Sequence, residues 1–491
     1  MKPLRLLAAI FIIFAGFTIY NLNIYEAPKD YPEIAEIKSK LAPIIRIEGQ
    51  DVKYSTLQER MEHYKVPAIS IAYMKNHKIK WTITQGVRDK ITNKPIDLNT
   101  IFQAASISKP TFATVLMKYR ELNGLDLDAP VNNLLTSWQL PKHQWSDKKP
   151  VTLRRLLSHS AGTTVHGFRG YARGETVPGI IDVLNGMEPA NSDPVIVDLE
   201  PSTQFRYSGG GTTLAQLILE DQSKDTLAAL AKSLVFEPLS MGHSEYIQPL
   251  FGALAKNKAT PYRGDGEPVE GGPHTYATLA AAGLWTTPSD LLKLAAGIQK
   301  SLKGEKNAIL SQETAREMLT PQQSPLGIGF FLEGDPITAF SHGGANEGFR
   351  AKLFAHKDTG DGIAIMTNTD SGNALITEVF ASVAEVMNWE EGLPKYKTLA
   401  KLTPDQYGKL IGNYKVSNPF EAVITLRENG GKIIATAEGF IDNMEFFPES
   451  ELNFFAMNGT PLVFELDETM NVKNIIFAGS ITAPKMAFTS N

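Results

Sequence analysis

The sequence predicts an α+β protein, in which a mixed α/β domain precedes a small all-β domain. Three observations lead to this prediction. The chain has 491 residues, which is too long for one compact domain. Up to Trp389, short apolar runs typical of strands alternate with segments of helical apolar spacing. Beyond a boundary at residues 394–404, the pattern changes to short alternating runs separated by hairpin signals such as Asn429-Gly-Gly431.

The composition excludes several classes of function. A net charge of −5 and the absence of a long basic run argue against a nucleic-acid partner. The chain has no cysteine, which excludes disulfides, thiolate metal sites, a cysteine nucleophile and a lipid-modified N-terminal cysteine. The nine histidines are scattered and form no His-Glu-x-x-His motif, so we predict no metal and no cofactor. No Gly-x-Ser-x-Gly elbow is present, which argues against an α/β-hydrolase.

The N-terminus has the layout of an export signal. Lys2 and Arg5 precede the uncharged apolar run Leu6–Ile19. No small-x-small cleavage site follows, so residues 1–24 are either a signal peptide or an N-terminal membrane anchor. A buried N-terminal helix is the remaining alternative. We therefore expect an exported protein, periplasmic or extracellular, with possible membrane attachment through residues 6–24. Residues 25–50 show little periodicity and are predicted to be a linker.

The first half of the chain shows a helix, a hairpin and a second helix. Thr56–Val66 is predicted to be a short amphipathic helix. The runs Ala68–Met74 and Lys78–Thr84 predict a β-hairpin around residues 75–77. After Phe102, apolar residues at helical spacing predict a helix that starts near Ser106 and stops at Asn123-Gly124.

Further elements follow up to the boundary. Helical segments are predicted at Val151–His159, after Gly211 and after the capping pattern Trp285–Asp290. Strands are predicted at Gly327–Leu332, Lys352–Ala355 and Gly362–Met366. In the tail, the predicted strands are Val423–Leu426, Ile433–Ala437, Glu445–Phe447, Leu462–Leu466 and Ile475–Phe477.

A serine and a lysine stand three residues apart in Ser106-x-x-Lys109. On a helix, such positions share one face, with Cβ atoms roughly 5–6 Å apart. A buried lysine loses part of its preference for the charged form, so its amine can act as a base toward the serine hydroxyl. Pro110 fits the first helical turn. A second match, Ser146-x-x-Lys149, lies in a polar loop before Pro150, so this motif alone is a weak signal.

Two other short motifs follow Ser106-x-x-Lys109 in the chain, namely Tyr207-Ser208-Gly209 and His342-Gly343-Gly344. In this order, the three motifs resemble those of the serine β-lactamase and penicillin-binding-protein superfamily, in its class C β-lactamase and esterase-like branch. The stretches 151–162, 237–242 and 281–290 resemble the same branch, so the resemblance covers about residues 50–390.

The resemblance implies a fold for each part of the chain. Residues 51–393 would form a β-lactamase/transpeptidase-like domain, with an antiparallel sheet flanked by helices beside an all-helical lobe. Residues 394–491 resemble more weakly the lipocalin-like β-barrel domain that is often appended to such hydrolases. The sequence does not indicate whether that domain gates the cleft, binds a partner or acts as a spacer.

The resemblance also implies roles for individual residues. Ser106 would be the acylated nucleophile, Lys109 would hold or accept its proton, and Tyr207 would relay protons or act as a phenolate. The backbone N–H groups of Ser106 and Ala345 would form the oxyanion hole, where each donor is worth roughly 3–4 kcal/mol. The remaining site residues are His342 as a catalytic residue and Gly209, Gly343, Gly344 and Asn346 in substrate binding.

Several of these residues have a structural alternative. Tyr207 is one of fifteen tyrosines and could be an ordinary packed side chain. His342 could cap the end of a strand, and Arg350 could bind a substrate carboxylate or form a structural ion pair. His159 is predicted to be structural, buried beside a helix end.

The chain departs from the family pattern at two positions. Gly209 replaces the asparagine of Y-x-N, whose amide holds the acyl side-chain amide of peptides and penicillins. His342 replaces the lysine of K-T-G, as in esterase and aminopeptidase relatives, and supplies a conditional charge instead of a fixed one. Both departures argue against a β-lactamase.

We therefore predict a serine hydrolase that forms an acyl-enzyme with an ester, an amide or a D-amino-acid peptide, and that needs no cofactor. Its partner would be a small-molecule or peptide substrate. The alternative is a penicillin-binding receptor or a scaffold whose acyl-enzyme never hydrolyses. The sequence predicts no oligomeric state.

Overall fold

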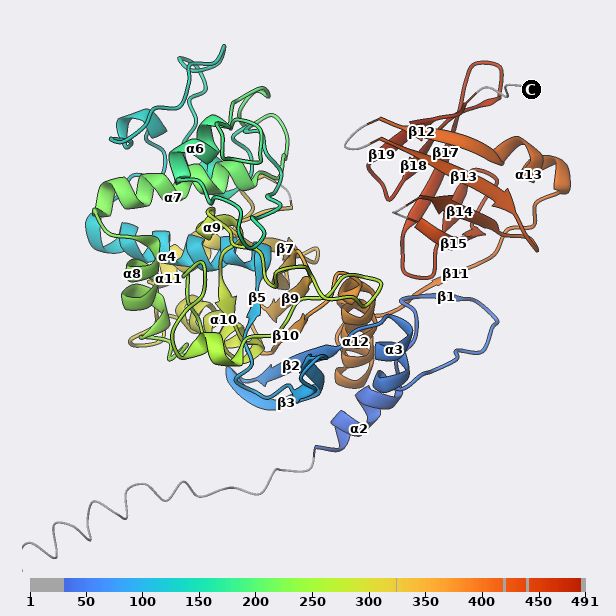
Figure 1. Ribbon diagram of the computed structural model, residues 1–491, viewed down its shortest axis with the longest axis horizontal. Coiled ribbons are helices and arrows are strands. Elements are labelled where there is room, and N and C mark those ends of the chain that lie inside the picture. The colour runs from blue at the N-terminus through green and yellow to red at the C-terminus, as the bar shows by residue number, and fades with distance from the viewer. Residues whose placement is uncertain (1–30, 324, 418–420, 439–440, 487–491) are drawn as a thin grey trace, which may run out of the picture.

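The computed structural model describes residues 31–486 except 324, 418–420 and 439–440 (Figure 1). The predicted signal peptide or membrane anchor at residues 1–24 lies outside the described residues. Within the described part of the chain, no helix combines the length and apolar character needed to cross a membrane.

The helical elements lie mainly between residues 100 and 390. In chain order they are α2 (Pro32–Ser39), α3 (Leu57–His63), η1 (Ala105–Ile107), α4 (Ser108–Asn123), η2 (Val131–Asn133), α5 (Leu153–Leu157), α6 (Ile180–Asn185), α7 (Gly209–Ser223), α8 (Leu227–Ala231), the π-helical η3 (Lys232–Phe236), η4 (Leu254–Asn257), α9 (Leu279–Ala282), α10 (Pro288–Leu302), α11 (Gln312–Met318), α12 (Gly372–Met387) and α13 (Pro404–Leu410).

The strands form two large sheets and two small pairs. Those before the boundary are β1 (Ile45–Ile47), β2 (Ala68–Lys75), β3 (Lys78–Asp89), β4 (Lys94–Pro95), β5 (Phe102–Gln103), β6 (Trp285–Thr286), β7 (Phe331–Glu333), β8 (Ala339–Asn346), β9 (Phe349–His356) and β10 (Gly362–Thr367). Those after it are β11 (Lys395–Lys397), β12 (Gly412–Val416), β13 (Ala422–Glu428), β14 (Ile433–Ala437), β15 (Ile441–Pro448), β16 (Asn453–Phe455), β17 (Pro461–Leu466), β18 (Val472–Phe477) and β19 (Ile481–Pro484).

A seven-stranded antiparallel sheet in the order β4-β3-β2-β10-β9-β8-β7 forms the centre of the first domain. Its central strands β2 and β10 are almost entirely buried because both faces of the sheet are covered. Alternate side chains point to opposite faces, so Ile69, Ile71 and Tyr73 of β2 join one hydrophobic cluster, while Ala68, Ala72 and Met74 join the other. Helices α2, α3 and α12 cover the first face, and α4 and α10 contribute to the core on the second.

The predicted fold class is confirmed. Figure 1 shows α6, α7 and α8 grouped with α4 and α11 at one end of the sheet, as expected for a helical lobe beside it. The hairpin forms as predicted from β2 and β3. The helix expected near Ser106 begins with a 3-10 turn at Ala105–Ile107, so Ser106 lies in that turn and Pro110 lies in the first turn of α4.

Three predicted boundaries differ from the structure. The strand predicted at Gly327–Leu332 is only Phe331–Glu333. Gly329 adopts φ +83°, and its backbone N–H donates to Leu157 O at 3.0 Å, so the chain turns where an extended strand was expected. The segment Val151–His159 is helical only over Leu153–Leu157. Helix α7 begins at Gly209 instead of after Gly211, because Ser208 Oγ caps it by accepting from Gly211 N at 2.8 Å.

The linker prediction for residues 25–50 is wrong for the part that the structure describes. Helix α2 packs against α12, and strand β1 pairs in parallel with β11. Arg46 of β1 forms a two-fold hydrogen-bonded ion pair with Glu385 of α12, at 2.6 and 2.7 Å. Low periodicity misled the prediction because both elements are short and are stabilised by contacts distant in sequence.

The C-terminal strands form an eight-stranded antiparallel sheet in the order β12 to β19. A bridge between Tyr414 and Lys485 brings the first and last strands together, so the sheet is a nearly closed barrel. Aromatic side chains such as Tyr414, Phe446 and Phe464 fill its interior. The sequence predicted five strands of this barrel, β13, β14, β15, β17 and β18, but missed β12, β16 and β19.

Candidate active site

Ser106 and Lys109 meet at the start of α4. Lys109 Nζ lies 3.1 Å from Ser106 Oγ and donates to Ala281 O at 2.8 Å. Lys109 is buried, with an exposed fraction of 4%, whereas Ser106 is partly exposed. Ala105 adopts φ +50°, a left-handed conformation that is costly for a residue with a side chain. The chain therefore bends sharply to present Ser106 at the helix entrance.

Hydrogen bonds hold this helix entrance in place. Ser108 Oγ donates to Ala105 O at 2.5 Å and accepts from Leu284 N at 3.0 Å. The buried Tyr246 donates its hydroxyl to Ser108 O at 2.6 Å. Because the residues on both sides of Ser106 are anchored, its hydroxyl is positioned by the fold and not by a flexible loop.

Tyr207 lies in an aromatic setting beside Lys109. Its ring centroid is 4.9 Å from Lys109 Nζ, 4.3 Å from the ring of His159 and 4.9 Å from the ring of His166. Phe331 stacks parallel to it at 6.4 Å. The structure thus places the Tyr207 ring beside Lys109, whose amine contacts Ser106 Oγ.

His159 positions Tyr207. It is buried beyond the end of α5, and its Nδ1 accepts a hydrogen bond from Ser208 N at 3.1 Å. A backbone N–H can only donate, so the neutral ring of His159 carries its proton on Nε2. Burial lowers the pKa of His159 well below its usual value, which keeps the ring neutral. The structural role predicted for this histidine agrees with these contacts.

His342 lies inside β8, not at the strand's end, and its side chain is buried. Its Nδ1 donates to Gly343 O at 2.6 Å, because a carbonyl can only accept, so Nε2 is the unprotonated nitrogen. Nε2 is buried and has no hydrogen-bond partner among the described residues. Burial, followed by the charge of Lys109, lowers the pKa of His342 to about 3. His342 is therefore neutral and cannot supply the cation that a lysine would place here.

Because His342 is buried in its neutral form, we predict that the folded protein loses stability as the pH falls. The pKa of His342 is about 3 in the folded protein and about 6.5 in the unfolded chain, so between these values only the unfolded chain binds the proton. The effect is absent above pH 6.5 and grows by about 1.4 kcal/mol for each unit that the pH falls toward 3. From pH 7 to pH 5, this residue should lower the free energy of unfolding by about 2 kcal/mol.

Urea unfolding at pH 7 and pH 5 measures this effect in the wild type and in His342→Gln. The variant should lose about 2 kcal/mol less between the two pH values, whatever its stability at pH 7. An equal loss in both proteins would show that His342 is not kept neutral by burial.

Strand β8 carries the predicted oxyanion donor. Its partner β7 pairs only as far as Ser341, so in the described part of the chain residues 342–346 have no strand partner on that edge. Gly343 and Ala345 are exposed, while Gly344 is buried against η1. A Cβ atom at Gly344 would lie 2.2 Å from Ala104 O, whereas one at Gly343 would meet nothing closer than 3.9 Å. Gly344 thus lets β8 approach the residues that precede Ser106.

Asn346 and Arg350 are held by the protein's own groups. Asn346 is buried and donates to Gln103 Oε1 at 2.8 Å and Ala282 O at 3.1 Å. Arg350 forms an ion pair with Asp370 at 3.1 Å, which is the structural alternative considered for it. Neither side chain is directed by these contacts toward a substrate carboxylate.

The structure places Gly209 against a loop that the sequence did not connect with the site. A Cβ atom at Gly209 would lie 3.1 Å from His166 O and 3.1 Å from Phe168 Cε2. Sequence reasoning missed His166, Phe168 and Phe331 because no motif marks them. The second Ser-x-x-Lys motif lies elsewhere: Ser146 Oγ accepts from His143 N in a turn, and Lys149 pairs with Glu200.

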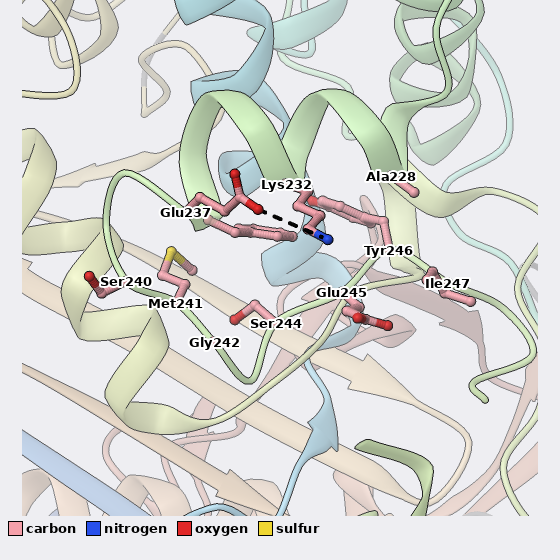
Figure 2. Close-up of a pocket in the computed structure, with 11 residues that line it drawn as sticks. Ala228, Lys232, Glu237, Ser240, Met241, Gly242, Ser244, Glu245, Tyr246 and Ile247 are labelled. Atoms are coloured by element: carbon pink, nitrogen blue, oxygen red, sulfur yellow. Dashed lines mark ion pairs between the residues drawn. The ribbon is translucent and has the colours of Figure 1, made fainter. Parts of the chain in front are cut away.

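A cavity of about 470 Å³ is separate from these residues (Figure 2). It is lined by residues of α8, η3 and the segment 237–247, and none of the site residues belongs to its lining. Tyr246 nevertheless connects the two places, because it lines the cavity and donates to Ser108 O.

The order and geometry of these motifs agree with the comparison with known families. A model of the beta-lactamase family, described as "Beta-lactamase", matches residues 55–387, which is more than half of the chain. The chain belongs to the beta-lactamase family. Members of this family are typically serine hydrolases, so Ser106 and Lys109 occupy a family fold that suits such chemistry.

Two relatives of this beta-lactamase-family protein differ in their described activities. Esterase EstB of Burkholderia gladioli is 27% identical over 219 residues, which are 43% of this chain and 53% of the esterase. Penicillin-binding protein 4 of Amycolatopsis lactamdurans is 23% identical over 371 residues, which are 72% of this chain and 94% of that protein. The chain thus spans about half the length of the esterase and nearly all of the penicillin-binding protein.

Solved structures share the fold of this beta-lactamase-family protein. SurE superposes with a TM-score of 0.54 and 20% identity, covering 87% of this chain and 97% of SurE. An octameric penicillin-binding protein homologue from Pyrococcus abyssi superposes with a TM-score of 0.56 and 21% identity, covering 87% and 98%. At these identities the similarity shows the fold alone.

The histidines near Tyr207 do not form a metal centre. Among the residues that the structure describes, no group of three or more histidine, cysteine, aspartate or glutamate side chains is arranged to hold a metal ion.

Proposed function

We propose that this protein hydrolyses esters or amides through an acyl-enzyme on Ser106. The observation that carries the proposal is the 3.1 Å contact between Lys109 Nζ and Ser106 Oγ, made by a lysine that is almost completely buried. A nucleophile within hydrogen-bond reach of a positioned base is the arrangement that activates a serine.

In the proposed first step, Ser106 Oγ attacks the substrate carbonyl carbon, and the unprotonated form of the Lys109 amine is the one that accepts its proton. The carbonyl oxygen becomes an oxyanion that accepts from the backbone N–H groups of Ser106 and Ala345. Collapse of this intermediate breaks the bond to the leaving group, which takes up a proton delivered by Lys109 or Tyr207. A water molecule then attacks the acyl-enzyme, its proton passes back through the same groups, and Ser106 is released.

Apart from Lys109, the basic side chains His342, Arg350 and Arg263 offer no free charge to the carboxylate of a penicillin or a peptide. His342 is neutral, since its pKa is about 3. Arg350 is paired with Asp370, and Arg263 is paired with Glu347 and Asp370. A carboxylate would have to break one of these ion pairs to gain a charged partner on this side of the site. We therefore place esters before β-lactams.

Active-site labelling tests the proposal. We expect a fluorophosphonate to add its mass to the intact protein, and benzylpenicillin to add none at a matched concentration. Ser106→Ala should lose the fluorophosphonate label, while Ser146→Ala, in the second Ser-x-x-Lys motif, should keep it. Absence of a label that depends on Ser106 would refute the nucleophile assignment.

A penicillin-binding protein without turnover is the second candidate. It is favoured by the match to penicillin-binding protein 4, which covers 94% of that relative. Labelling by benzylpenicillin that depends on Ser106, with a burst of product and no steady state, would favour it over the esterase. Continuous ester turnover would favour our first proposal.

A further inference from the structure

Three consecutive glycines begin α7, directly after Tyr207 and Ser208, and a loop lies against all of them. A Cβ atom at Gly210 would lie 2.8 Å from Thr164 O, and one at Gly211 would lie 2.7 Å from Thr163 Oγ1. At Gly209 the obstructing atoms are His166 O and Phe168 Cε2, each at 3.1 Å. The missing side chains thus make room for residues 163–168.

This loop is fixed at both ends. At its start, Ser208 Oγ donates to Thr164 O at 2.6 Å. The N–H of Gly210 donates to Val165 O, and the N–H of Gly209 donates to His166 O, each at 3.0 Å. At its end, Tyr171 and Thr275 exchange two backbone hydrogen bonds of 2.8 Å. The residues between these anchors, 167–170, are therefore held near the beginning of α7.

The loop places aromatic surface beside Tyr207. The ring of His166 lies 4.9 Å from that of Tyr207, whose other neighbours include Phe331 at 6.4 Å. Phe168 is partly exposed and its ring edge occupies the space that a side chain at position 209 would need. Lys109 Nζ, which contacts Ser106 Oγ, lies 4.9 Å from the Tyr207 ring centroid, so the Tyr207 side of this surface borders the reacting group.

We propose that Phe168 forms the wall of the acyl-group pocket and selects acyl groups that are apolar next to the scissile carbonyl. The assignment rests on the proposed function, and it names the substrate class for the same site. A phenyl ring offers contact but no hydrogen bond, so an apolar acyl chain is stabilised there. An acyl group that bears an amide beside the carbonyl would have to bury that amide against the ring without a partner, which costs binding energy.

Acyl-group preference in the full-length protein tests the assignment. The probes are 4-nitrophenyl esters of butyric acid, phenylacetic acid and N-acetylglycine, compared by kcat/KM. The wild type should prefer the two apolar esters to the N-acetylglycine ester by tenfold or more. Phe168→Ala should reduce that ratio by about tenfold, in the range by which pocket contacts alter discrimination. Phe251→Ala, which removes an exposed phenylalanine outside the site, should leave the ratio unchanged.

A second substitution makes the test independent of the alanine variant's folding. Phe168→Leu keeps an apolar side chain and should shift the ratio in the same direction by a smaller factor. Gly209→Asn alone should impair all three esters, because its side chain meets Phe168 and His166 O. In the double variant Phe168→Ala/Gly209→Asn, kcat/KM should be impaired less than in Gly209→Asn alone. This recovery should be largest for the N-acetylglycine ester.

The possible failures are distinguishable. If the fluorophosphonate labels Ser106 but neither Phe168 variant changes the ratio, the pocket assignment is overturned and the hydrolase proposal stands. If the wild type neither hydrolyses an ester nor takes the label at Ser106, the proposed function is refuted and the pocket assignment with it.

Discussion

Replacing Lys109 with methionine is expected to slow fluorophosphonate labelling of Ser106 by about a thousandfold, within the range attributed to a positioned base. Methionine keeps the length and apolar stem of lysine but removes the amine that contacts Ser106 Oγ at 3.1 Å. The serine would then lose the group that takes its proton during attack. Mass spectrometry of the intact protein over time measures the labelling rate.

The same substitution has a structural cost that must be separated from the chemical one. Lys109 Nζ also donates to Ala281 O, so the variant leaves a buried carbonyl without this donor, at a cost of about 1–3 kcal/mol. Thermal unfolding of the variant measures that cost. A folded protein with a thousandfold slower label would assign the loss to the missing base.

Lys118→Met is the matched control on the same helix. Lys118 lies in α4, is partly exposed, and pairs with Glu121 at 3.3 Å. Such an exposed pair contributes at most about 1 kcal/mol, so labelling should stay close to that of the wild type. Equal labelling rates in Lys109→Met and the wild type would contradict the role of Lys109 as the base.

The parts of the site that the sequence could predict are those that depend on local spacing. Ser106 and Lys109 face each other because they are separated by about one helical turn. Their spacing in the sequence is enough to predict this proximity. Tyr207 and His342 required the order of three motifs and a family resemblance. The structure brings all four residues to one place, although none of the connecting loops has a pattern that could be predicted.

The parts that the sequence could not predict depend on contacts between distant segments. The neutral state of His342 follows from its burial in β8, not from its neighbours in the chain. Phe168 became a candidate only when the structure placed its ring 3.1 Å from a Cβ position at Gly209. Likewise, β1 is only three residues long and forms because β11, some 350 residues later, pairs with it. A single sequence does not show such partners.

A different experiment compares Gly343 and Gly344, two neighbouring glycines that the sequence pattern does not distinguish. Gly344→Ala should slow labelling of Ser106 by about a hundredfold, and Gly343→Ala should leave it nearly unchanged. A Cβ atom at Gly344 would lie 2.2 Å from Ala104 O and 3.3 Å from Ala105 Cβ, so β8 and η1 would have to move apart. An error of about 1 Å in the position of reacting groups costs about a hundredfold in rate.

The reason for the large effect is that the two elements each supply one N–H group of the proposed oxyanion hole. Ser106 belongs to η1 and Ala345 to β8, and Gly344 lies directly before Ala345. Moving the elements apart would lengthen at least one of the two hydrogen bonds to the oxyanion, each worth roughly 3–4 kcal/mol.

Gly343→Ala is the control. It introduces the same methyl group on an exposed position whose nearest atom is 3.9 Å away, so it controls for strand propensity and added bulk. A small fluorophosphonate is the appropriate probe, because a large substrate could also touch position 343. Equal slowing in both variants would show that the close approach of β8 to η1 does not set the oxyanion geometry, and that the glycines act on the strand itself.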